Sequence, residues 1–134
     1  MRFVSALAAS ALLLAGAASG IAATQKGEER LARIIDGRVA GKPVGCIYLP
    51  RVRSSQIISG TAIVYDAGST IYVNRPDGGA RSLSSGDVMV TKPHANQLCK
   101  VDIVRLRDQG THFERGFVNL GNFIPYTRTA KARD

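Results

Sequence analysis

Short apolar runs, each ended by turn residues, recur at intervals of about ten residues between Gly45 and Tyr126. Runs of this length and spacing are typical of antiparallel β-strands. Apolar residues make up 45% of the 134-residue chain and charged residues 21%, close to the globular average, so the pattern predicts one folded domain. The expected strands cover residues 46–49, 55–58, 61–65, 70–74, 88–90, 100–106, 116–120 and 123–126.

Two of these runs flank the segment 66–69, Asp-Ala-Gly-Ser, which has turn chemistry of hairpin length. Gly68 is available for a positive φ angle, so residues 61–74 are predicted to form a β-hairpin. Tyr65 and Tyr72 would then form a cross-strand aromatic pair. The fold class that follows is mainly β, a small antiparallel meander that is sandwich-like or a partly open barrel.

One short helix is expected ahead of the strands, over residues 28–36. Leu31, Ile34 and Ile35 recur there at helical spacing, and two glutamates at the start suit the positive end of the helix dipole. Gly37 is placed to end the helix.

The first 23 residues have the anatomy of a signal peptide. Arg2 supplies the positive start, an uncharged apolar stretch follows, and the end is rich in Ala, Gly and Ser, so we predict cleavage after Ala23. An uncleaved membrane anchor is the alternative, which the small-residue composition disfavours. The mature protein is expected to be periplasmic or secreted, and the chain to contact a membrane only transiently, through the signal peptide. The expected organisation is a signal peptide (1–23), a leader with a short helix and connector (24–44), a disulfide-closed β domain (45–126) and a polar tail (127–134).

Cys46 and Cys99 are the only cysteines of the chain. Export places them in an oxidising compartment, where an even count predicts pairing. The disulfide would tie the strand at Cys46 to the chain just before Lys100, and closing such a loop stabilises by about 4 kcal/mol in the chain-entropy model. Zinc binding by both cysteines with His94 and His112 is the alternative, but the short ligand pairs of structural zinc sites are absent, so no metal is expected.

The charge of the chain is basic but diffuse. The formal net charge is +8, or +7 once Arg2 leaves with the signal peptide, and no block of like charges occurs. Such a field attracts polyanions, which outside the cytoplasm are envelope components and not nucleic acid. A solvated basic surface with no anionic partner remains the alternative. The candidate anion-binding residues are Arg75, Arg81, Arg105 and Arg107.

Residues for catalysis do not form a recognisable pattern. A G-x-S-x-G nucleophile motif is absent, and the phosphate-binding Gly-rich motif is also missing. Carboxylates could pair for glycoside hydrolysis, but aspartates in turns are more often structural. A sheet face that combines arginine and tyrosine could bind nucleic acid by stacking on its bases. A cross-strand tyrosine pair that stabilises the hairpin explains the same tyrosines equally well. We therefore predict no enzyme, no catalytic residue and no cofactor. The residues weighed are Asp66, Asp87, Asp102 and Glu114 for hydrolysis, and Tyr65, Tyr72, Arg75 and Arg81 for stacking.

Several short segments resemble a family of small exported proteobacterial proteins with a domain of unknown function. They are Cys46-Ile47, the basic stretch through Arg53, the strands 61–65 and 70–74, and the closing segment Leu-Gly-Asn-Phe-Ile-Pro-Tyr at 120–126. The resemblance covers about residues 28 to 126 and implies export and no known catalysis. It assigns no functional residues, and the further cysteines common in that family's second half are absent here.

Three functions are therefore expected, in order. The first is a non-enzymatic periplasmic or secreted β domain that binds an anionic envelope component or acts structurally. The alternative is a binding module for a small ligand or an envelope protein, which needs a concave pocket. The third is an envelope hydrolase, which needs acidic or histidine side chains converging in one cleft.

Overall fold

The structure is a computed structural model that describes residues 18–129, with side chains from Thr24 onward. Within these residues the chain is mainly β, with strands paired antiparallel and one α-helix, which confirms the predicted fold class. The sheets do not close into a barrel. The elements are α1 (Ala18–Ile34), β1 (Arg38–Ala40), β2 (Cys46–Tyr48), η1 (Leu49–Arg51), β3 (Ser54–Ile58), β4 (Ala62–Asp66), β5 (Thr70–Asn74), η2 (Ala80–Ser82), β6 (Asp87–Val90), β7 (Gln97–Cys99), β8 (Ile103–Asp108), β9 (Glu114–Asn119) and β10 (Phe123–Arg128).

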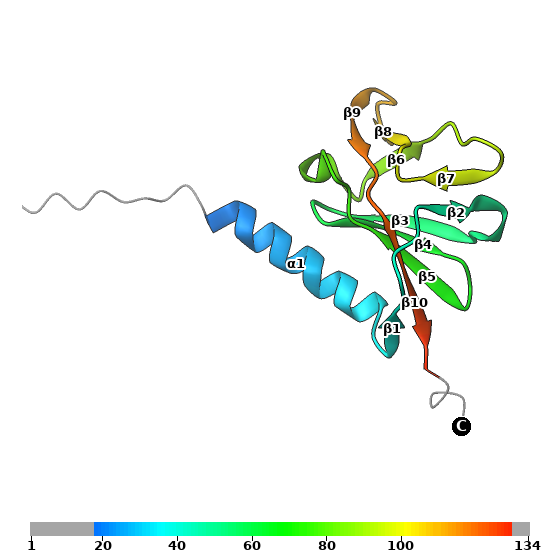
Figure 1. Cartoon of the computed structure of the whole chain (residues 1–134). Helices are drawn as coiled ribbons and strands as arrows, with labels where there is room; N and C mark the ends of the chain where they lie inside the picture. Colours follow the sequence, from blue (N-terminus) through cyan, green and yellow to red (C-terminus); the bar gives the residue numbers. More distant parts are fainter. Residues whose placement is uncertain (1–17, 130–134) are drawn as a thin grey trace, which may run out of the picture.

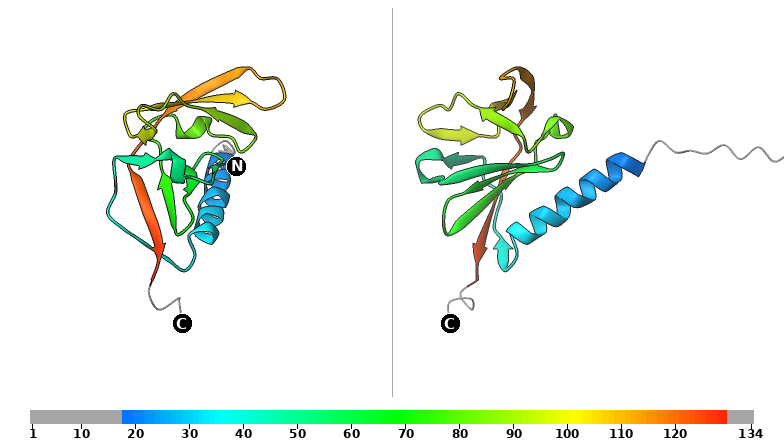
Figure 2. Two further views of the ribbon diagram at one scale, coloured as in Figure 1. Left: turned by 90° about the vertical axis from the view of Figure 1, so that its right-hand side faces the viewer. Right: turned by 180° about the vertical axis from the view of Figure 1, so that it is seen from behind.

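A five-stranded sheet of order β1-β10-β5-β4-β3 forms the middle of the molecule. Helix α1 lies against one of its faces, and the smaller sheets β2-β7 and β6-β8-β9 lie on the other side (Figures 1 and 2). Both faces are therefore covered, and β4 shows the result: Ala62 and Val64 belong to the core under α1, whereas Ile63 and Tyr65 belong to the core between the sheets. This is why β4 is a continuous apolar run in the sequence.

Helix α1 begins ten residues before the predicted start at Glu28 and ends at Ile34. Leu31, Ile34 and Ile35 pack on the sheet as their spacing predicts, and Gly37 has a φ of 73° just after the helix. The expected signal peptide falls mostly outside the described residues, and α1 runs through the predicted cleavage point after Ala23. Among residues 18–129 no helix is long and apolar enough to cross a membrane.

Helix α1 meets the β3–β4 turn at Gly27, which is buried. A β-carbon at this position would overlap the hydroxyl of Thr61, in the β3–β4 turn. A glycine is therefore required where the helix meets the turn. The part of α1 before this contact extends beyond the sheet (Figure 1).

The chain order in the large sheet departs from a simple meander. The strands β3, β4 and β5 follow one another, but the next neighbour of β5 is β10, with β1 beyond it. Residues 38–40, expected as part of a connector, form β1, and Arg38 lies opposite Arg128. The predicted polar tail therefore begins inside a strand, because β10 continues through Thr127 and Arg128.

Cys46 and Cys99 form the predicted disulfide. They lie directly opposite each other in β2 and β7, with 4.0 Å between their Cα atoms. The strand expected over 100–106 begins only at Ile103, as β8, and β7 before it was not predicted. In the turn between them the Asp102 carboxylate accepts a 2.7 Å hydrogen bond from the Cys99 N–H. A disulfide of this kind is typical of an oxidising compartment.

Candidate functional site

The outward side of the sheet β6-β8-β9 combines arginines with exposed apolar side chains. In β8 the burial alternates strictly, so that Val104 and Leu106 are fully buried while Ile103, Arg105 and Arg107 point to solvent. The buried set fills the core between the sheets, which fixes the direction of the other set. We call the outward set the outer face, which comprises Val88, Val90, Ile103, Arg105, Arg107 and Phe117.

Strand register interleaves the charged and apolar members of the outer face. Arg105 lies between Val90 of β6 and Phe117 of β9, and Phe117 is 55% exposed. Arg107 lies between Val88 of β6 and Glu114 of β9. Among the described residues, five of the seven large apolar side chains that are exposed belong to this sheet or its loops, so the concentration is specific to this part of the molecule. They are Val88, Val101, Ile103, Phe113 and Phe117.

The hairpin between β8 and β9 presents Phe113, which is 75% exposed. One oxygen of Asp108 accepts hydrogen bonds from the N–H groups of Gly110 and Thr111, at 2.9 and 2.7 Å, and from the Thr111 hydroxyl at 3.0 Å. These bonds, that from the Thr111 N–H above all, lower the pKa of Asp108. The Asp108 carboxylate therefore bonds the backbone of the turn that carries Phe113.

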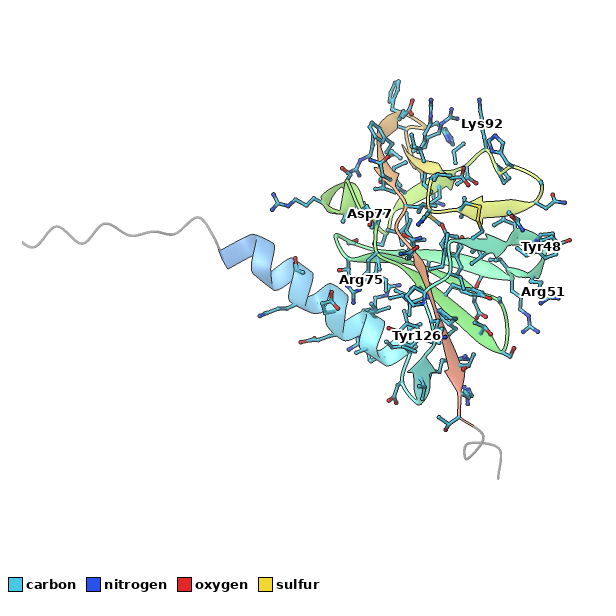
Figure 3. The ribbon with its side chains drawn as sticks, in the orientation of Figure 1. Tyr48, Arg51, Arg75, Asp77, Lys92 and Tyr126 are labelled. Carbon is cyan, nitrogen blue, oxygen red and sulfur yellow. A yellow bond between two sulfur atoms is a disulfide. The ribbon has the colours of Figure 1, made fainter. Side chains whose placement is uncertain are left out.

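The arginines of the outer face differ in their partners. Arg105 forms a 3.3 Å ion pair with Glu114, and both side chains are about half exposed. Such a pair is weak in water. Arg107 has no ion-pair partner among the described residues. Lys92, just after β6, lies at the same end of the molecule (Figure 3). Lys92 was not among the anion-binding residues predicted from the sequence.

Arg75 lies away from the outer face. Its guanidinium forms a bidentate ion pair with Glu28 of α1, at 2.6 and 2.9 Å, on the α1 side of the large sheet (Figure 3). The hydrogen bond from Arg75 lowers the pKa of Glu28. Arg75 is thus occupied in holding the helix. Arg81 is exposed on η2, which packs beside β9, so of the four predicted arginines the structure brings Arg105 and Arg107 together on one strand.

The stacking face considered from the sequence does not form, because Tyr65 is buried. Tyr65 lies opposite Tyr72 in register, as the hairpin predicts, but its ring packs edge-on against Phe123 at 5.8 Å. Its hydroxyl has no hydrogen-bond partner among the described residues, and burial raises the pKa of Tyr65. The aromatic residue opposite an exposed arginine is instead Phe117, which faces Arg105.

The carboxylates weighed for hydrolysis serve separate local roles. Asp66 accepts a 2.8 Å bond from the Gly68 N–H in the hairpin turn, and Asp102 accepts one from Cys99. Asp87, whose side chain is buried, pairs with Arg115 at 3.3 Å. Both cysteines are in the disulfide, so the four-ligand zinc alternative with the histidines does not form, and the described residues contain no cluster of three metal-ligating side chains.

Comparisons with protein-family models, with curated proteins and with solved structures find no match for this chain. The resemblance to a family of small exported proteins stays a prediction. The case for function therefore depends on the geometry of the molecule.

Proposed function

We propose that this chain is a periplasmic or secreted β domain that works without catalysis and binds an anionic component of the envelope. The outer face is the binding surface in this proposal. Its occupant is an anionic lipid surface, because each arginine that faces outward on β8 has an apolar neighbour in register.

The interleaving of Arg105 with Val90 and Phe117 is the observation that carries the proposal. An arginine can lay its aliphatic stem along apolar neighbours while its guanidinium bonds a phosphate in two places. Exposed phenylalanines next to such groups add apolar area that a lipid headgroup region can cover. A carbohydrate polyanion would use the arginines and leave Phe113 and Phe117 in water.

Long-range electrostatics act in the same direction. The net charge is +8 for the full chain and +7 without Arg2, so the protein is attracted to anionic surfaces before any contact forms. Each basic residue close to an anionic membrane adds about 1 kcal/mol, and the attraction fades beyond a Debye length. Binding should therefore weaken as salt is added.

The test is co-sedimentation of the oxidised protein with vesicles of phosphatidylglycerol and phosphatidylcholine, compared with phosphatidylcholine alone. Substituting Arg105→Gln and Arg107→Gln together should weaken binding by about 2 kcal/mol, or roughly thirtyfold. The matched control substitutes Arg33→Gln and Arg51→Gln, which removes the same charge from exposed positions elsewhere. Equal losses in the two double variants would show that only diffuse charge matters.

The apolar part of the proposal has its own control. Phe117→Ala should weaken vesicle binding, whereas Tyr48→Ala, which removes another half-exposed aromatic residue from a strand, should not. If Phe117→Ala binds vesicles as well as the unsubstituted protein while the arginine variant fails, the occupant is a polyanion without an apolar part. If none of the variants changes retention, the proposal is wrong.

A further inference from the structure

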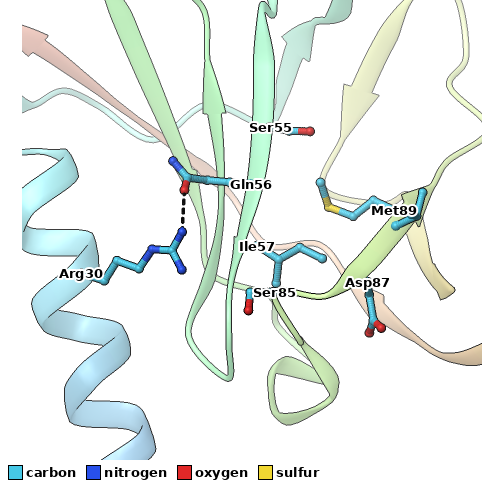
Figure 4. Close-up of a pocket in the computed structure, with 8 residues that line it drawn as sticks. Arg30, Ser55, Gln56, Ile57, Ser85, Asp87 and Met89 are labelled. Carbon is cyan, nitrogen blue, oxygen red and sulfur yellow. Dashed lines mark hydrogen bonds between the residues drawn. The ribbon is translucent and has the colours of Figure 1, made fainter. Parts of the chain in front are cut away.

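A groove of about 360 Å³ lies between two open sheet edges (Figure 4). One wall is β3, the edge strand of the five-stranded sheet, and the other is β6, the edge strand of the three-stranded sheet. Helix α1 adds one residue to the rim. The lining residues are Arg30 from α1, Ser55, Gln56 and Ile57 from β3, and Ser85, Asp87, Val88 and Met89 in and before β6.

The groove follows the strand edges and not a sheet face. Gln56 and Ile57 are neighbours in β3 and point to opposite faces: Gln56 bonds Arg30 of α1, and Ile57 is part of the core between the sheets. On β6, Val88 is exposed and Met89 packs on that core. A groove lined by both members of each pair must run along the edge of each strand.

Both walls are edge strands, so each has backbone groups without a partner strand, although the Asp87 N–H at the start of β6 donates to the Ser84 carbonyl at 3.0 Å. In an antiparallel edge strand every second residue directs its N–H and C=O away from the sheet. Proteins usually protect such edges with charged residues or proline, but β3, with sequence Ser-Ser-Gln-Ile-Ile, has neither. The opposite edges are less open: β1 has three residues, and β9 is partly covered because Gly78 bridges Asn119.

The two walls meet at one end of the groove. The Ser85 N–H donates to the Ser59 hydroxyl at 3.0 Å, and the Gly60 N–H donates to the Leu83 carbonyl at 3.0 Å. Strand β3 leads into this end and β6 leaves from it. An extended chain would enter from the other end.

We propose that this groove binds an extended segment of a partner polypeptide, which adds as a strand between β3 and β6. Main-chain hydrogen bonds to the two edges give such complexes their affinity, and alternating side chains give them their specificity. The groove shares only Val88 with the outer face, and the inference does not depend on lipid binding.

The chemistry of the partner follows from the two sides of the groove. On the α1 side the guanidinium of Arg30 donates to the Gln56 side chain at 3.1 Å and has no carboxylate partner among the described residues. On the other side lie Ile57 and the half-buried Met89, together with Asp87, whose buried carboxylate is paired with Arg115. Side chains of a strand alternate between faces, so the segment should alternate acidic and apolar residues. A second copy of β3, which carries no acid, would leave Arg30 unpaired.

The test uses a short blocked peptide of alternating Glu and Val, added to the full oxidised chain. Amide hydrogen exchange followed by NMR should show new protection in β3 and β6 and unchanged exchange in β9. The matched control is the same peptide with alternate backbone amides methylated, which removes the ladder donors and leaves the side chains. Absence of new protection, or equal protection by the methylated peptide, would overturn the proposal.

The side-chain part is tested with Arg30→Gln, against Arg33→Gln on the exposed surface of the same helix as control. The first substitution should weaken the Glu–Val peptide about fivefold and leave a Gln–Val peptide unchanged, since the ion pair is partly exposed. Equal losses for both peptides, or a dimer of the chain that forms through β3 without peptide, would contradict the assigned partner.

Discussion

Removing the side chain of Asn74 should be the most damaging polar substitution in this protein. Asn74 is fully buried at the end of β5, where its amide donates to the Gly121 carbonyl at 2.8 Å and accepts from the Gly121 N–H at 3.0 Å. Gly121 itself has no room for a side chain, because a β-carbon there would overlap the Arg75 carbonyl. The side-chain amide thus completes the backbone bonding of the segment that leads into β10.

The magnitude follows from the two groups that Asn74→Ala would leave unpaired. Each buried donor or acceptor without a partner costs about 1–3 kcal/mol. We therefore expect the free energy of unfolding to fall by about 3 kcal/mol, out of a total of roughly 5–15 kcal/mol for a domain of this size. With a urea dependence of about 1–2 kcal/mol per molar, the midpoint should fall by roughly 1.5–3 M.

The assay is urea unfolding of the oxidised protein followed by far-ultraviolet circular dichroism. Asn122→Ala is the matched control, because Asn122 is exposed in the same segment, and it should change the free energy of unfolding by less than about 0.5 kcal/mol. Asn74→Asp keeps one acceptor and loses the donor, so it should destabilise strongly at neutral pH. If Asn74→Ala costs no more than Asn122→Ala, the bonding described for Gly121 is wrong.

Three further outcomes are expected. Replacing Cys46 and Cys99 by Ser opens a loop whose ends are 53 positions apart, so the free energy of unfolding should fall by about 4 kcal/mol. The measurement is urea unfolding against the oxidised protein, and a loss below about 1 kcal/mol would contradict this expectation. Tyr65→Phe should be neutral or stabilising at neutral pH, since the buried hydroxyl has no partner among the described residues. Because burial raises the pKa of Tyr65, this hydroxyl loses its proton at a lower pH in the unfolded chain than in the folded protein. The free energy of unfolding should therefore fall as the pH rises above about 10, and thermal melts of Tyr65→Phe should lack that alkaline loss. Arg75 lowers the pKa of Glu28, so the ion pair stabilises the fold at pH values above the unfolded pKa of Glu28. This stabilisation is lost as the pH falls through the folded pKa. Glu28→Gln should remove this acid-side loss of stability, which is less than about 1 kcal/mol because the pair is half exposed.

Local features of the fold were accessible from the sequence because their causes are local. The hairpin of β4 and β5 depends on a turn in which Asp66 bonds Gly68 two residues on. The helix could be placed at Leu31 and Ile34 from spacing, but its start at Ala18 could not, because the small-residue stretch was assigned to the signal peptide. The disulfide followed from two cysteines and an expected compartment.

The candidate site could be predicted only in part. Arg105 and Arg107 are two residues apart, so any strand would place them on one face, and they were among the predicted residues. That Phe117 lies beside Arg105 depends on the pairing of β8 with β9, which contains a register shift after Leu106. Arg75 was predicted with them, but its pairing with Glu28 joins positions 47 apart.

The sequence by itself determined most of the strands but not β1 and β7, and it determined the β4–β5 turn and the pairing of the cysteines, since each depends on residue chemistry within a few positions or on a simple count. Only the tertiary structure decided that β10 lies between β5 and β1, that β7 pairs with β2 instead of with β6 or β8, and that β3 and β6 line the same groove. Such contacts join segments far apart in the chain, and their energies come from burying shared apolar surface. A strand's own residues say which side is apolar, but not which distant segment will cover it.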